Sequence, residues 1–100
     1  LKALKRATQL GPDNPDNFFG LGLTNQMAGR HAEAEAALTE ALALDDTHTE
    51  ARLALIRLYL DQSRWEDAQR QLARIEADDP GNETAAELRH ILKSRQAETY

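Results

Sequence analysis

The sequence contains no cysteine and no valine, and only five of its 100 residues are aromatic. Without cysteine, the chain has no disulfide framework and no zinc–thiolate site. Because sheets are built mainly from β-branched and aromatic side chains, the absence of valine argues against a β fold. No apolar run approaches the roughly 20 residues that span a bilayer, so we expect no membrane insertion.

The residues that are abundant favour helices. The chain has 17 alanines and 15 leucines, and both are good helix formers. A length of 100 residues allows one domain. Acidic side chains outnumber basic ones by 17 to 12, which makes the chain a poor ligand for nucleic-acid phosphates. We therefore expect a single all-α domain that binds no nucleic acid.

Turn-forming clusters recur at a fixed interval. Pro12, Asp46 and Pro80 each lie in such a cluster and are 34 residues apart. When residues 15–48 are laid on residues 49–82, six positions are identical. The identical pairs are Leu21/Leu55, Arg30/Arg64, Ala34/Ala68, Leu38/Leu72, Ala43/Ala77 and Asp45/Asp79. An internal repeat of this period indicates a stack of similar units.

Each period divides again at a weaker break, at Gly29 and at Ser63. The pattern therefore predicts pairs of short helices joined by tight turns. The expected helices are 1–10, 15–28, 31–44, 48–62, 65–78 and 83–97.

Helix-capping residues support these boundaries. Asn14 before Pro15 is expected to cap one helix, and Asn82 is expected to cap the last one. Two further motifs read as capping boxes, in which a hydroxyl residue is followed three positions later by glutamate. They are Thr47-x-x-Glu50 and Ser63-x-x-Glu66.

The 34-residue unit resembles the tetratricopeptide repeat, a helix–turn–helix family. The resemblance covers two whole repeats, residues 15–48 and 49–82. It makes residues 1–14 the tail of a preceding repeat and residues 83–100 a capping helix and tail. The resemblance implies a right-handed α–α superhelix. The leucines expected to fill its core, beside small residues such as Gly22, Ala34 and Ala68, are Leu21, Leu38, Leu55 and Leu72.

The titratable residues form no catalytic constellation. His31 is expected to pack into a turn, His48 to be solvated, and His90 to contact Glu87 on the surface. No helical zinc motif and no glycine-rich phosphate loop is present. We expect no enzyme activity, no cofactor and no bound metal.

A protein-binding groove is the main functional candidate. In the tetratricopeptide family, the first helices of successive repeats line a concave groove. Helical spacing independently places Phe19, Leu23 and Gln26 on one face and Leu53, Arg57 and Leu60 on another. With Met27 added, these residues form the predicted groove, in which Arg57 would orient a partner carboxylate. The expected function is non-catalytic binding of a partner peptide or helix, as a scaffold segment of a larger repeat protein.

Two alternatives remain open. The first is a homodimer formed through an open N-terminal edge, where Leu1 and Leu4 would be exposed. The second is a regulatory appendage of an enzyme encoded outside this segment. No targeting segment is visible, so the compartment stays open, with the cytoplasm slightly favoured.

Overall fold

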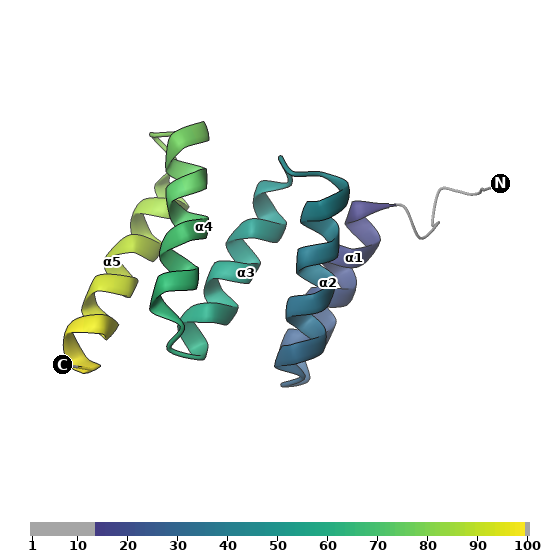
Figure 1. The fold of residues 1–100 in the computed structure, drawn as a ribbon, viewed down its shortest axis with the longest axis horizontal. Helices are drawn as coiled ribbons and strands as arrows, with labels where there is room; N and C mark the ends of the chain where they lie inside the picture. Colours follow the sequence, from purple (N-terminus) through teal and green to yellow (C-terminus); the bar gives the residue numbers. More distant parts are fainter. Residues whose placement is uncertain (1–13, 100) are drawn as a thin grey trace, which may run out of the picture. The chain divides into compact units, whose positions relative to one another are not determined.

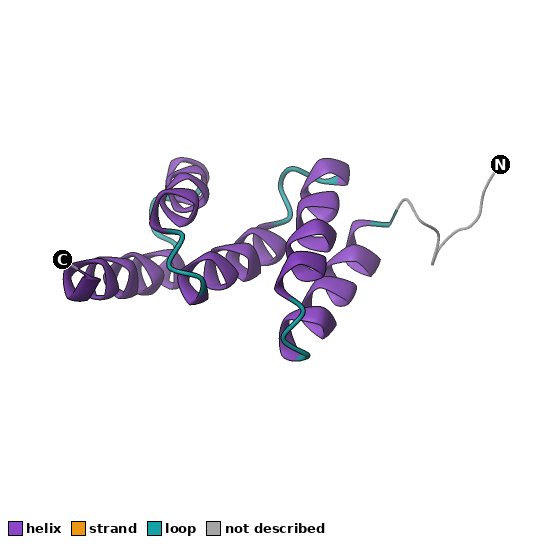
Figure 2. Cartoon of the chain, turned by 60° about the horizontal axis from the view of Figure 1, so that its bottom comes forward, coloured by secondary structure: helices purple, strands orange, loops and turns teal. Residues whose placement is uncertain are grey.

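The computed structural model describes residues 14–99 and consists of five α-helices joined by short turns (Figures 1 and 2). No strand occurs among these residues. The predicted bounds 31–44 and 65–78 are confirmed, and the other described helices differ from prediction by one or two residues at an end. The predicted helix 1–10 lies outside the described residues. The helices are α1 (Pro15–Met27), α2 (His31–Leu44), α3 (Thr49–Asp61), α4 (Trp65–Asp78) and α5 (Glu83–Thr99).

Contacts within the chain divide it into two units, the first ending at Ala51 and the second beginning at Arg52. In the first unit, α1 packs on α2. The two helices approach closely at Gly22, where an added Cβ would lie 2.6 Å from the Cγ and Cδ2 atoms of Leu38. Leu38 and Ala34 are fully buried, which confirms the expectation that small residues let the two helices meet.

The prediction that Leu21 lies in the core is wrong, because its side chain is 51 % exposed. Leu38, Leu55 and Leu72 are buried as predicted. Leu21 lies one residue before Gly22, which faces α2, so its side chain is turned about 100° away from that contact.

The helix ends confirm two of the predicted caps. The side chain of Asn14 accepts a hydrogen bond from the backbone N–H of Asp16 (2.9 Å), and that of Asn82 accepts one from Ala85 (2.9 Å). The capping box at Ser63 is wrong, because α4 begins after Arg64, which makes no side-chain cap.

Ser63 itself has a φ of 59°, in the left-handed region that closes the turn after α3. The equivalent turn after α1 uses Gly29, with a φ of 80°. The two repeats therefore share a turn geometry, and Ser63 adopts it at a steric cost that glycine avoids.

Polar side chains join the helices of the second unit. Arg52 stands where the resemblance expects a bulky residue, and it is buried, with Nη1 donating to Oε1 of Gln71 (2.6 Å). Between α4 and α5, Arg89 donates from Nε and Nη2 to the two carboxylate oxygens of Glu76, both at 2.7 Å. This two-pronged geometry is among the stronger forms of ion pair. The apolar core beside them contains Leu72, Ile75, Leu88 and Leu92.

The Gly22–Leu38 approach predicts opposite effects for alanine at two glycines of α1. Gly22→Ala should destabilise the fold by about 1–3 kcal/mol, because the buried side chain of Leu38 must move. Gly20→Ala is the control, since its added Cβ would meet nothing within 4 Å. That change should stabilise the fold by about 0.5–1 kcal/mol through helix propensity. Urea unfolding of both variants measures the difference, and equal effects would contradict the close approach.

The Glu76–Arg89 pair predicts an acid-sensitive contribution to stability. The hydrogen bond from Arg89 holds the pKa of Glu76 below its ordinary value of 4.5. The contribution is therefore present above pH 4.5 and is lost as the pH falls through the lowered pKa. Since both side chains are about one-third exposed, we expect at most about 1 kcal/mol.

The measurement is urea unfolding as a function of pH. Glu76→Gln should lower stability at pH 7 and flatten the decline below pH 4.5, whereas Glu87→Gln, at an exposed position of α5, should leave both unchanged. A Glu76→Gln profile parallel to that of the original chain would show that the pair does not contribute.

Candidate interaction surface

The groove residues predicted on α1 differ in their exposure. Phe19, Leu23 and Gln26 are half-buried. Met27, in the last turn of the helix, is 88 % exposed. Helical geometry places Leu23 and Met27 one turn apart on the same face. The apolar surface that α1 offers on this face is therefore centred on Met27 and continues to Leu23.

The groove residues predicted on α3 also differ in their exposure. Arg57 is exposed and Leu53 is half-buried. Leu60 is 4 % exposed, so its side chain is a core side chain and lines no accessible surface. Nearly every other residue of α3 from Ala51 to Leu60 is buried, which leaves Arg57 as the exposed side chain in that stretch.

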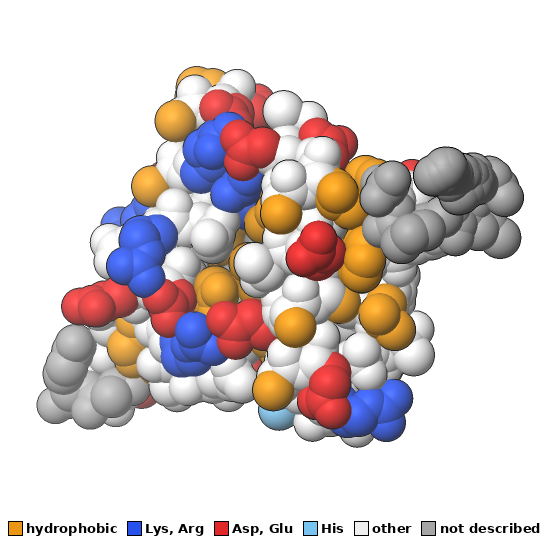
Figure 3. All heavy atoms as spheres, turned by 45° about the vertical axis from the view of Figure 1, so that its right-hand side comes forward, with side chains coloured by type: hydrophobic (Ala, Val, Ile, Leu, Met, Phe, Trp, Pro, Cys, Tyr) orange, Lys and Arg blue, Asp and Glu red, His pale blue; other side chains and the backbone are white. Residues whose placement is uncertain are grey.

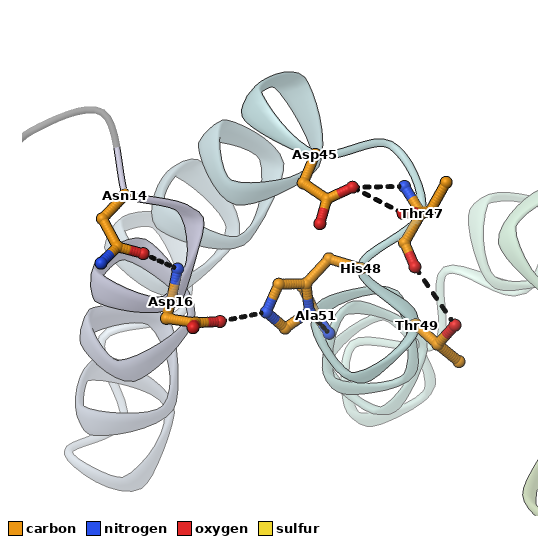
Figure 4. A network of polar contacts seen from close by, with 7 residues as sticks. All are labelled: Asn14, Asp16, Asp45, Thr47, His48, Thr49 and Ala51. Carbon is orange, nitrogen blue, oxygen red and sulfur yellow. Dashed lines mark hydrogen bonds and ion pairs between the residues drawn. The ribbon is translucent and has the colours of Figure 1, made fainter.

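The expectation of a solvated His48 is wrong. Its side chain is 8 % exposed, and its ring lies 5.1 Å from the ring of Phe19, centroid to centroid, at an angle of 44°. The Nε2 atom is 2.9 Å from Oδ1 of Asp16, and the backbone N–H of Ala51 donates to Nδ1 at 3.1 Å (Figure 4). This network covers Phe19 and joins the start of α1 to the start of α3.

The two bonds fix the tautomer of His48. Because Nδ1 accepts from Ala51, the ring proton lies on Nε2 and is donated to the carboxylate of Asp16. Both ring nitrogens are thus engaged in hydrogen bonds within the chain. His31, which was expected to pack into a turn, is exposed instead.

Figure 4 also shows how the turn before α3 is ordered. Oδ1 of Asp45 accepts hydrogen bonds from the backbone N–H of Thr47 (3.0 Å) and from its hydroxyl (2.6 Å). These bonds hold the pKa of Asp45 below its ordinary value. The hydroxyl of Thr47 is therefore used within the turn. It does not form the predicted capping box, and the cap of α3 is His48.

Charge is distributed unevenly along the chain. Residues 14–51 contain seven acidic side chains and one basic side chain, Arg30. The Nε of Arg30 donates to Oδ1 of the buried Asn25 at 2.8 Å. Residues 52–99 are nearly balanced, with nine acidic and eight basic side chains. The seven acidic side chains of residues 14–51 are Asp16, Glu33, Glu35, Glu40, Asp45, Asp46 and Glu50.

A hollow of about 350 Å³ lies in the second unit, where the start of α4 meets Gln96 of α5. Its lining includes Trp65, Arg64 and Asp67. Arg64 pairs with Asp67 at 2.9 Å and stacks over the ring of Tyr59 at 4.5 Å, and Arg70 also pairs with Asp67. Two of the lining residues, Arg64 and Asp67, are therefore already paired with each other.

Two sequence-family models match the chain, both described as tetratricopeptide repeat. One covers residues 26–91 and the other covers residues 1–49. The chain belongs to the tetratricopeptide repeat family. Comparison with curated proteins and comparison with solved structures give no match.

Tetratricopeptide repeats generally serve as protein–protein interaction modules and are typically non-catalytic. Among residues 14–99, no group of three or more acidic or histidine side chains is arranged to hold a metal ion. None of the described helices is long and apolar enough to cross a membrane. Leu1 and Leu4, the predicted self-association residues, lie outside the described residues.

His48 is the residue whose role the sequence analysis missed. The signal was the 34-residue period itself, because His48 is equivalent to Asn14 and Asn82. Each of these three residues caps the helix that follows it. Histidine is an uncommon cap, and the hydroxyl of the neighbouring Thr47 looked like the better candidate.

The network around His48 predicts that its capping role can be separated from its packing role. His48→Ala removes the acceptor for Ala51 and should cost about 0.5–2 kcal/mol. His48→Asn restores an acceptor at a position where Asn14 and Asn82 already cap, so it should recover most of that loss. Thermal unfolding of the two variants provides the test. Equal destabilisation by both would show that contact with Phe19, and not the cap, is the larger contribution.

Proposed function

We propose that this tetratricopeptide segment is a non-catalytic scaffold that binds a partner peptide or helix along the exposed faces of α1 and α3. In this proposal, residues 15–48 and 49–82 are two repeats, residues 1–14 end a preceding repeat, and residues 83–100 form a capping helix and tail. The groove is the one implied by the family resemblance.

The observation that carries the proposal is the exposure of Met27. An unbranched apolar side chain that is 88 % exposed gains free energy when a partner covers it. Methionine also adapts its shape to different partners, because its side chain is flexible and polarizable. Leu23, one turn earlier and half-buried, extends the same apolar face.

Arg57 supplies the polar part of the site. It is exposed, and its guanidinium is suited to a bidentate contact with a carboxylate. Phe19 contributes indirectly, because it is covered by His48 and supports the face instead of forming it. Gln26 is half-buried beside Met27 and offers an amide for a backbone contact. Leu60 is omitted because it is buried.

The proposal predicts that two exposed positions control binding without affecting stability. Peptides of twelve residues would be selected from a random display library on the full chain, and their affinities measured by titration. Met27→Glu and Arg57→Glu should each weaken the selected peptides tenfold or more, which corresponds to about 1.4 kcal/mol. Both variants should unfold like the original chain, because both side chains are exposed.

Ile91→Glu is the matched control, since Ile91 is an exposed apolar residue on α5 and lies outside the proposed face. Its affinities should equal those of the original chain. Selected peptides that bind all three variants equally would contradict the site, and a library that gives no binder would contradict peptide recognition by this segment.

A further inference from the structure

The two glycines of α1 differ in what the fold requires of them. At Gly22 an added Cβ would meet Leu38, whereas at Gly20 it would meet nothing within 4 Å. Gly20 is also not among the residues with a positive φ, the backbone conformation that favours glycine. Glycine inside a helix costs stability relative to alanine. The described part of the chain therefore gives Gly20 no packing role and leaves an open space above its backbone.

Gly20 lies on the same side of α1 as Met27. Successive residues are rotated by about 100° around the helix axis, so Gly20, Leu23 and Met27 all lie within about 40° of Asp16. We call these four residues the Asp16–Met27 face. The space above Gly20 is bordered by the carboxylate of Asp16, about 6 Å away along the axis, and on its other side by the apolar side chains of Leu23 and Met27.

The carboxylate of Asp16 is exposed to solvent and is also held in place. Its side chain is 79 % exposed, and its Oδ1 lies 2.9 Å from Nε2 of His48, whose side chain is 8 % exposed. The backbone N–H of Asp16 donates to the side chain of Asn14 at 2.9 Å. A carboxylate accepts several hydrogen bonds, so Asp16 can accept from a partner as well as from His48. Because these bonds limit its motion, pairing with a partner costs less conformational entropy.

The charge of the surrounding residues favours a basic partner. Residues 14–51 carry seven acidic side chains and one cation, Arg30, whose Nε donates to Asn25. Figure 3 shows hydrophobic side chains interspersed with acidic ones on the side of the molecule that it presents. Complementary charge steers encounter and selects among partners. A segment that binds along α1 is therefore expected to bring both apolar surface and positive charge.

We propose that the Asp16–Met27 face takes a protein segment in which a lysine or arginine lies two to four residues from a large apolar side chain. The apolar side chain fills the space above Gly20 against Leu23 and Met27, and the cation pairs with Asp16. Side chains about 6 Å apart on one face are two residues apart in an extended segment and three or four apart in a helix. This inference rests on the proposed function and names the chemistry of its partner.

The first test is the composition of peptides of twelve residues selected from a random display library on the full chain. A lysine or arginine two to four positions from a large apolar residue should occur more often than in the unselected library. Peptides that lose affinity with Met27→Glu but show no such enrichment would overturn this inference and leave the proposed function standing. A library that gives no binder would overturn both.

The second test measures the contact with Asp16 by calorimetric titration of the full chain. Each selected peptide is compared with an analogue in which its cation is replaced by glutamine. Asp16→Asn keeps an acceptor for His48 and should weaken the cationic peptide about threefold, the modest effect of a partly exposed ion pair, without weakening the analogue.

Glu40→Gln is the matched control, because it removes the same charge from an exposed position of α2 in the same unit. It should leave the affinity of both peptides unchanged. An equal loss with Glu40→Gln, or an equal loss for the analogue with Asp16→Asn, would show that the cation makes no contact with Asp16 and would overturn the pairing.

The third test separates the binding role of Gly20 from its effect on the fold. Gly20→Gln should raise the midpoint of urea unfolding, because glutamine is the better helix former, and should weaken the selected peptides about tenfold by filling the space. Thr39→Gln, at an exposed position of α2, is the matched control and should raise the midpoint without weakening binding. Equal affinities of the two variants would overturn the inference, and so would a lowered midpoint for Gly20→Gln, which would give Gly20 a role in the fold.

Discussion

Helices α1, α3 and α5 each begin at a side chain that accepts a hydrogen bond from a backbone N–H of the first turn. The three acceptors are Asn14, His48 and Asn82, and they are 34 residues apart. The first turn of a helix has backbone donors without partners, so a cap at a fixed interval determines where each repeat begins. The turns inside the two repeats agree equally well, since Arg30 and Arg64 each donate a backbone N–H to the carbonyl five residues earlier, at 2.8 Å.

This backbone framework leaves the side chains room to differ. Asn25 and Tyr59 are equivalent positions with different chemistry, yet both are partners of the arginine five residues later. Asn25 accepts from the guanidinium of Arg30, whereas the ring of Tyr59 lies beneath the guanidinium of Arg64. Arginine can do both because its planar group donates hydrogen bonds and also stacks on aromatic rings. The identity of Arg30 and Arg64 therefore has a structural reason that holds in each repeat.

Helix positions could be predicted from the sequence because their signals are local. The bounds of α2 and α4 follow from turn residues and caps within a few positions of each end. The failures concern contacts between distant residues. Periodicity puts Leu21 on an apolar stripe but does not say what covers it, and the partners of His48 lie 29 and 32 residues away, at Phe19 and Asp16. At Ser63, the residues fit a capping box, but the N-cap position of α4 is one residue later, at Arg64.

The candidate site was predictable only in part for the same reason. Helical spacing placed Leu23, Met27 and Arg57 on helix faces, but the exposure of each side chain depends on what packs against it. Leu60, predicted to line the groove, is instead buried in the core. The two exposed apolar residues of α1, Leu21 and Met27, are six positions apart and so point about 120° away from each other. One short helix can therefore present two independent surfaces, one near the acidic side chains of α2 and one near Leu23. Because a single substitution reaches only one of these surfaces, the contribution of each surface to partner binding can be measured separately.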